Sequence, residues 1–137
     1  MTRLVLIILV FLLFTAGAEA SENRMEVIIG KHTFSAVLGE GETARALSSR
    51  LPLTFDMSDL NGNEKYHYLD KALPSAPEKV DKICAGDIML YGDNCIVVFY
   101  KSFSTSYRYT QIGHIEDASA LENAVGKGNI TISFSLR

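Results

Sequence analysis

The segment 130–136 alternates apolar residues with threonine and serine, and it is the most regular pattern in the chain. A period of two places successive side chains on opposite faces of a β-strand, so this segment predicts a strand with one buried face. Shorter or less regular runs predict further strands at 25–29, 33–38, 53–57, 65–69 and 108–115.

The most apolar part of the mature sequence is a pair of runs, 87–91 and 95–100, separated by Gly92-Asp93-Asn94. A turn of this composition between two apolar runs is typical of a β-hairpin. Residues 96–99 are apolar at every position, whereas a strand with one solvated face would alternate. The pattern therefore predicts a strand that is buried on both faces, between the protein interior and a covering element.

Helical spacing is confined to two short segments. Thr43 is expected to cap a helix that Pro52 ends, and Asp117 or Ser119 is expected to cap a second helix through Ala124. Seven or eight strands with two short helices predict a mainly β domain that forms a small closed barrel.

The first twenty residues follow a different pattern. Arg3 precedes an unbroken apolar run, and small residues around Ala20 offer a cleavage site, as in secretory signal peptides. We therefore expect a signal peptide over 1–20 and a mature domain over 21–137 that is periplasmic or secreted. The apolar run is shorter than the roughly 20 residues of a spanning helix, and an uncleaved anchor is the alternative.

Composition narrows the expected partners. The chain has 137 residues with 13 basic and 16 acidic side chains, a net charge of −3, and the charges form no blocks. Nucleic acid and, after cleavage of the signal, membrane surfaces are therefore not expected partners. The length suits one domain, and the oligomeric state is left open.

Two cysteines in an exported chain raise the question of a disulfide. In the predicted hairpin Cys95 directly follows the turn, while Cys84 lies beyond the far end of the other strand. At about 3.3 Å per residue, the strand between them is longer than the ~7 Å between Cα atoms that a bridge allows. We expect two free thiols, with Cys95 buried, raised in pKa and inert.

The element order and the segments "DLNGNEKY", "GDIMLYGDNC" and "SFSTSY" resemble the bacterial cyclophilin-like proteins from about Met25 to Arg137. The resemblance implies a cyclophilin-like barrel with helices covering its ends. True cyclophilins carry a catalytic arginine followed by a Phe-Met-x-Gln-Gly-Gly run, and this chain has Tyr66-His67-Tyr68-Leu69 in its place. Prolyl isomerisation would therefore need a divergent site, for which Arg108 is the candidate arginine.

A segment rich in aromatic and hydroxyl residues, 100–109, follows the buried strand. In a groove, such rings supply apolar area and the hydroxyls orient a ligand. The alternative is that the rings only cover the end of the barrel. The expected ligand-binding residues are Met57, Tyr66, Tyr100, Phe103, Thr105, Tyr107 and Arg108.

Metal and cofactor chemistry is not predicted. The oxygen-bearing side chains at 59–64 are followed by Tyr66 and Tyr68 where a calcium loop needs further ligands, so they are expected to stabilise a turn. The three histidines are isolated in sequence, which gives no zinc spacing. No catalytic residue, metal or cofactor is assigned.

The sequence therefore predicts an exported module that holds a peptide or small molecule in its groove. We expect it to act without catalysis, and the alternative is a peptidyl-prolyl cis-trans isomerase with a divergent active site. A redox or hydrolytic enzyme would require a reactive thiol or serine. These residues alone leave open whether the protein is an enzyme and which ligand it holds.

Overall fold

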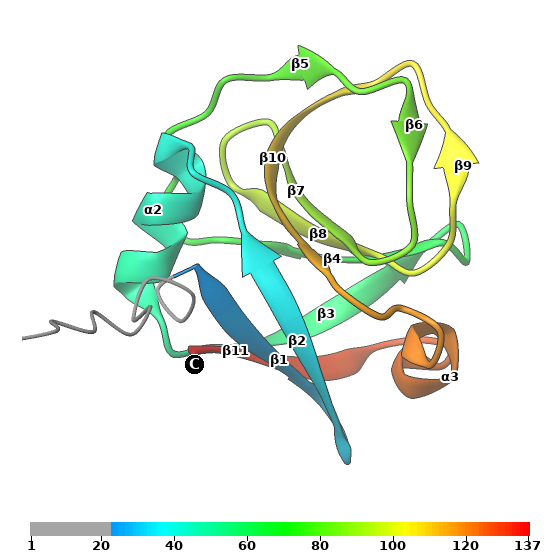
Figure 1. The fold of residues 1–137 in the computed structure, drawn as a ribbon. Helices are drawn as coiled ribbons and strands as arrows, with labels where there is room; N and C mark the ends of the chain where they lie inside the picture. Colours follow the sequence, from blue (N-terminus) through cyan, green and yellow to red (C-terminus); the bar gives the residue numbers. More distant parts are fainter. Residues whose placement is uncertain (1–22) are drawn as a thin grey trace, which may run out of the picture.

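The computed structural model describes residues 23–137, and the predicted signal peptide over 1–20 lies outside them. Eight antiparallel strands form the main sheet, and a pairing between β10 and β2 closes it into a barrel (Figure 1). In the order of the sheet the strands are β2 (His32–Leu38), β1 (Arg24–Ile29), β11 (Ile130–Leu136), β3 (Leu53–Leu60), β4 (Glu64–Tyr68), β8 (Cys95–Phe99), β7 (Asp87–Tyr91) and β10 (Arg108–Ile115). The expected mainly β barrel is confirmed.

Three two-residue strands lie outside this barrel. They are β5 (Glu78–Lys79), β6 (Lys82–Ile83) and β9 (Phe103–Ser104). β5 pairs with β10, and β6 pairs with β9. In Figure 1 the three strands follow an outer arc beyond β7 and β8. The chain thus adds a partial second layer to one part of the barrel wall.

Two short helices, α2 (Glu42–Arg50) and α3 (Leu121–Val125), lie well apart on the barrel (Figure 1). Each turns apolar side chains toward the barrel core, with Leu47 of α2 and Leu121 of α3 fully buried. The helices are where the sequence predicts them, which confirms the expected number of helices among residues 23–137.

The predicted helix caps are wrong. Gly41 precedes α2, and the Thr43 hydroxyl instead donates a hydrogen bond of 2.5 Å to the carbonyl of Pro74. Ala120 precedes α3, while the carboxylate of Asp117 accepts a hydrogen bond from the backbone N–H of Ser119. Neither side chain therefore caps its helix: Thr43 bonds to a residue distant in sequence, and Asp117 bonds to a residue two positions along the chain.

Strand β8 separates two apolar clusters. Ile96 and Val98 face the barrel interior, whereas Cys95, Val97 and Phe99 face outward. All five residues of β8 are buried. The outward cluster also contains buried side chains from β6, β7 and β10: Ile83, Met89 and Tyr109. The prediction that this strand lies between the interior and a covering element is confirmed.

No helix among residues 23–137 has the length and apolarity needed to cross a membrane.

Candidate functional site

A cavity of about 600 Å³ lies against the outward face of β4 and β8. The alternation along β4 turns Glu64, Tyr66 and Tyr68 to this face, because these residues are two positions apart. The register pairs Tyr66 with Val97 and Tyr68 with Cys95, so these side chains form the floor. The site is therefore on the wall of the barrel, outside the barrel interior.

The segment 103–107 forms the facing side of the cavity. Pairing of β9 with β6 anchors its start, and the backbone N–H of Thr105 donates to the carbonyl of Asp81 at 2.9 Å. The hydroxyl of Thr105 then accepts a hydrogen bond of 3.1 Å from the backbone N–H of Tyr107. These bonds hold the polar segment in a defined shape opposite the strand floor.

Aromatic rings supply most of the large side chains around the cavity. The lining includes the rings of Tyr66, Tyr68, Tyr91, Phe103, Tyr107 and Tyr109. They also contact one another: Tyr91 and Tyr107 lie edge to face at 6.1 Å between ring centroids, and Tyr91 lies 5.6 Å from Tyr109. Offset and edge-to-face contacts of this kind stabilise a fixed arrangement of rings. The hydroxyls of residues 104–106 give the same wall hydrogen-bonding capacity.

Glu64 is the carboxylic acid of the cavity. It is 8 % exposed and, within residues 23–137, its carboxylate has no hydrogen-bond or ion-pair partner. Burial, together with the nearby negative charge of Asp59, raises the pKa of Glu64 to about 7. The carboxyl group of Glu64 therefore changes its charge near neutral pH, whereas an exposed glutamate does so near pH 4.5.

Cys95 lies in the floor of the cavity and is 4 % exposed. Burial and the charge of Glu64 raise the pKa of its thiol to about 11, so the nucleophilic thiolate is scarce at neutral pH. The other cysteine, Cys84, is exposed, and both are free thiols. The expectation of a buried Cys95 with a raised pKa is confirmed.

The predicted ligand-binding residues divide into two groups. Tyr66, Phe103, Thr105 and Tyr107 line the cavity. The other three do not. Met57 is fully buried in the barrel core, Tyr100 is 7 % exposed in the same core, and Arg108 is exposed outside the lining. The structure thus brings four of the seven residues to one cavity and places the other three elsewhere, Met57 because strand alternation turns it inward.

The opposite face of β4 carries a buried lysine, Lys65. Lys65 is 0 % exposed, and its ammonium group donates to the carbonyls of Gly126 at 2.9 Å and Gly128 at 2.6 Å. It also forms an ion pair of 3.0 Å with Asp59. This network joins β4 to the loop between α3 and β11.

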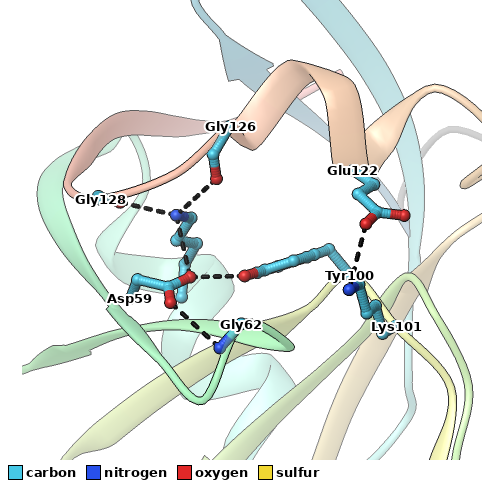
Figure 2. A network of polar contacts seen from close by, with 8 residues as sticks. Asp59, Gly62, Tyr100, Lys101, Glu122, Gly126 and Gly128 are labelled. Atoms are coloured by element: carbon cyan, nitrogen blue, oxygen red, sulfur yellow. Dashed lines mark hydrogen bonds and ion pairs between the residues drawn. The ribbon is translucent and has the colours of Figure 1, made fainter.

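The carboxylate of Asp59 forms one ion pair and accepts two further hydrogen bonds in this network. Its partners are Lys65, the hydroxyl of Tyr100 at 2.5 Å and the backbone N–H of Gly62 at 3.1 Å (Figure 2). Burial raises the pKa of Asp59, but these hydrogen bonds and the lysine charge outweigh it and leave the pKa below its ordinary value. The bond to Gly62 confirms that Asp59 stabilises the turn between β3 and β4.

Histidines take no part in the cavity. His32 and His114 line other, more distant depressions, and His67 stacks on Phe55 with 4.4 Å between ring centroids. Within residues 23–137, no three His, Cys, Asp or Glu side chains gather as metal ligands would.

Sequence reasoning missed Glu64 as a residue of the site. The available signal was the spacing of two between Glu64 and Tyr66, which puts both on one face of the predicted strand. Glu64 also continues the polar turn segment 59–63, and this local pattern favours a turn residue over a strand residue. Only the long-range return of segment 103–107 shows that this face borders a cavity.

A closed antiparallel barrel of eight strands with two short helices is consistent with a cyclophilin-like fold. The chain belongs to the Cyclophilin-like family, whose model matches residues 27–135. None of the curated proteins matches the chain.

Two solved structures share the fold. The solution structure of the hypothetical protein AF2241 from Archaeoglobus fulgidus has a TM-score of 0.62 and 19% identity, covering 85% of this chain and 96% of that one. The structure of McbB in complex with tryptophan has a TM-score of 0.60 and 16% identity, covering 82% of this chain and 44% of McbB. At these identities the likeness shows the fold alone.

Proposed function

We propose that this protein is an exported binding module that holds a peptide or small molecule in the cavity against β4 and β8. The observation that carries this proposal is the set of six aromatic rings around one concave space of about 600 Å³. Ligand sites are typically of this size and combine apolar rings with a few polar groups. Here the hydroxyls of segment 103–107 and the carboxyl of Glu64 are those polar groups.

The supporting details favour binding of a planar, apolar group. Tyr91, Tyr107 and Tyr109 already contact one another, so a ligand that packs against them would lose less affinity to ordering these rings. A protein of the same fold, McbB, is in complex with tryptophan. An aromatic ligand, or an aromatic side chain of a peptide, is accordingly the first class to test.

Export rests on the pattern of the first twenty residues, which have a basic start, an apolar run and small residues before Ser21. The mass of the protein recovered from the periplasm or medium would then correspond to a chain that begins near Ser21. A full-length chain retained with the cytoplasm would contradict export without affecting the cavity.

The composition of the chain permits a direct binding test. The protein contains no tryptophan, so the emission of an indole ligand, excited where tyrosine does not absorb, reports the ligand alone. We expect 3-methylindole and L-tryptophan to shift their emission to shorter wavelength on titration with protein. Tyr66→Ala should weaken binding about tenfold, because it removes a ring from the cavity wall.

Arg108→Ala is the control for this titration, because Arg108 is exposed and outside the lining. Its binding curves should match those of the unaltered protein. Emission that does not respond to the protein, or an equal loss in both variants, would show that the cavity is not a binding site for such ligands.

Prolyl isomerisation is separated from binding by a proline-peptide assay on the same proteins. The binding module should leave the isomerisation rate unchanged. A protein-dependent rate enhancement that Arg108→Ala removes would establish the isomerase instead. Arg108 lies outside the cavity, and no contact of the described residues favours that outcome.

A further inference from the structure

The aromatic cavity contains one strongly polar and buried side chain, Glu64. Among the described residues that line the cavity, Glu64 is the single carboxylate, and no lysine, arginine or histidine is present. Several aromatic rings and one carboxyl group therefore line the cavity, without a positively charged side chain among the described residues beside them.

The two carboxylates near this site differ in their partners. Asp59 is held by Lys65, Tyr100 and Gly62, whereas Glu64 has no such partner within residues 23–137. A buried carboxylate is ordinarily paired, because its loss of hydration is otherwise uncompensated. The missing partner of Glu64 would thus have to come from outside the chain.

A second unpaired acceptor lies beside the acid. Asn63 also lines the cavity, and its Oδ1 atom is buried without a hydrogen-bond partner among the described residues. Hydrogen-bond acceptors without donors are therefore concentrated where β4 begins. A ligand that brings N–H donors and a positive charge to this end of the cavity would pair with the carboxylate of Glu64.

We propose that the cavity selects a small aromatic amine, whose ammonium group pairs with the carboxylate of Glu64 while its ring packs among the cavity's aromatic side chains. This inference rests on the proposed binding function and names its ligand class. An ammonium group also interacts favourably with the faces of tyrosine rings, which Tyr66 and Tyr109 provide on the same wall as Glu64. Glu64 is 8 % exposed, so its carboxylate has already lost much of its hydration in the folded protein, and pairing removes less water from it than from an exposed carboxylate.

The pairing should depend on pH through Glu64. The ionisable groups around it are Asp59, Tyr66, Tyr68, Tyr91, Cys95, Tyr100, Tyr107 and Tyr109. Burial and the hydrogen bond to Asp59 raise the pKa of Tyr100 well above its ordinary value, so its phenol stays neutral over the range of the test. Burial and nearby charge raise the pKa of Cys95 to about 11 and that of Tyr109 to about 12, while the pKa of Asp59 is below its ordinary value. These three groups keep one charge state between pH 6 and 8.5.

The test compares three indoles of similar size by their own fluorescence: tryptamine, the neutral 3-methylindole and the anionic indole-3-propionate. We expect tryptamine to bind about tenfold more tightly than 3-methylindole at pH 8.5, and indole-3-propionate to bind most weakly. Between pH 8.5 and pH 6 the affinity for tryptamine should fall about tenfold, because the carboxylate becomes protonated while 3-methylindole is unaffected.

Glu64→Gln should remove both the preference for tryptamine and its pH dependence, while leaving 3-methylindole binding intact. Glu26→Gln, on β1 outside the cavity lining, is the matched control and should keep both. Equal binding of tryptamine and 3-methylindole, or a preference that survives Glu64→Gln, would overturn the amine assignment and leave the binding function standing. A failure of all three indoles to bind would overturn both.

Discussion

Glu64 and Lys65 are adjacent in sequence, both charged and both buried, yet their surroundings are opposite. Alternation along β4 turns Lys65 to the interior, where it finds two carbonyls and a carboxylate, and turns Glu64 to the outer cavity, where it finds none. The lysine is a structural residue whose charge is fully satisfied. The glutamate has no partner among the described residues, and a carboxyl group with a raised pKa in a cavity is a candidate functional group.

The pKa of Glu64 makes stability depend on pH. Because the pKa rises from an ordinary 4.5 to about 7 on folding, the folded state holds this proton more tightly than the unfolded state. The resulting stabilisation is present below pH 4.5 and is lost as the pH rises to about 7. Glu64→Gln, which is always neutral, should therefore be more stable than the unaltered protein at pH 8.5 by about 2 kcal/mol, at about 1.4 kcal/mol per pKa unit less solvent screening.

Urea denaturation at pH 4.5 and pH 8.5 measures this effect. The two proteins should unfold at nearly the same urea concentration at pH 4.5 and diverge at pH 8.5, whereas Glu26→Gln should show no such divergence. If Glu64→Gln gained nothing at the higher pH, burial would not disfavour the ionised form of Glu64, and the explanation of its raised pKa would be wrong.

At the scale of elements, the strands were largely predictable and their surroundings were not. The bounds of β10 and β11 match the predicted segments 108–115 and 130–136. For β11 the reason is regular period-two alternation over seven residues, which is a local signal. The strand β8 was predicted as buried on both faces from the opposite local signal, an apolar run without alternation. The caps of α2 and α3 were missed because Thr43 and Asp117 bond elsewhere.

The cavity was only partly predictable for a related reason. The polar and aromatic composition of segment 103–107 indicated a binding surface, and Tyr66 was assigned to it. That β6 and β9 pair with each other outside the barrel is a long-range contact that no local pattern encodes. Without this contact, neither the position of the groove on the wall nor the inclusion of Glu64 follows from the sequence.

The loop between α3 and β11 depends on one side chain from β4. Lys65→Met keeps the apolar length of the side chain but removes the donor to the carbonyls of Gly126 and Gly128 and the countercharge of Asp59 (Figure 2). Breaking a buried ion pair from one side ordinarily costs about 3–5 kcal/mol. We expect a loss of this size in the free energy of unfolding, measured by urea denaturation at pH 7.

Lys101→Met is a matched control for this variant. Lys101 forms an ion pair of 3.3 Å with Glu122 in the same region, but both side chains are about half exposed (Figure 2). Exposed pairs contribute roughly 0–1 kcal/mol, so this variant should be nearly as stable as the unaltered protein. Equal effects of the two substitutions would mean that burial of Lys65 does not determine the strength of its network.

At the scale of the whole molecule, the position of the cavity depends on closure of the barrel. β10 pairs with β7 on one side and with β2 on the other, so it carries Tyr109 to the cavity while it completes the sheet. Gly113 lies at the point where both pairings meet, opposite Leu38 and Ile88. A bulge beside it, between Gln111 and Gly113, bends the strand around the closing seam.

A side chain at Gly113 would disturb this seam. A Cβ atom there would lie 2.3 Å from the carbonyl oxygen of Val37 and 3.2 Å from the Cα atom of Leu38, both backbone atoms of β2. The two strands would have to separate, so Gly113→Ala should destabilise the protein by about 3 kcal/mol, at the upper end of the cost of overpacking. Gly41→Ala is the control, because no atom lies within 4 Å of a Cβ there and its φ of −71° suits alanine.

Hydrogen exchange tells local opening of the seam from a general loss of stability. If closure depends on Gly113, the amides that pair β2 with β10 should exchange fastest in Gly113→Ala, ahead of those that pair β1 with β11. The free energy of unfolding of Gly41→Ala, measured by urea denaturation, should change by less than about 1 kcal/mol, because only the residue that precedes α2 is altered. Uniform exchange across all strands would instead mean that the barrel opens as a single unit and that the seam is no weaker than the rest of the sheet.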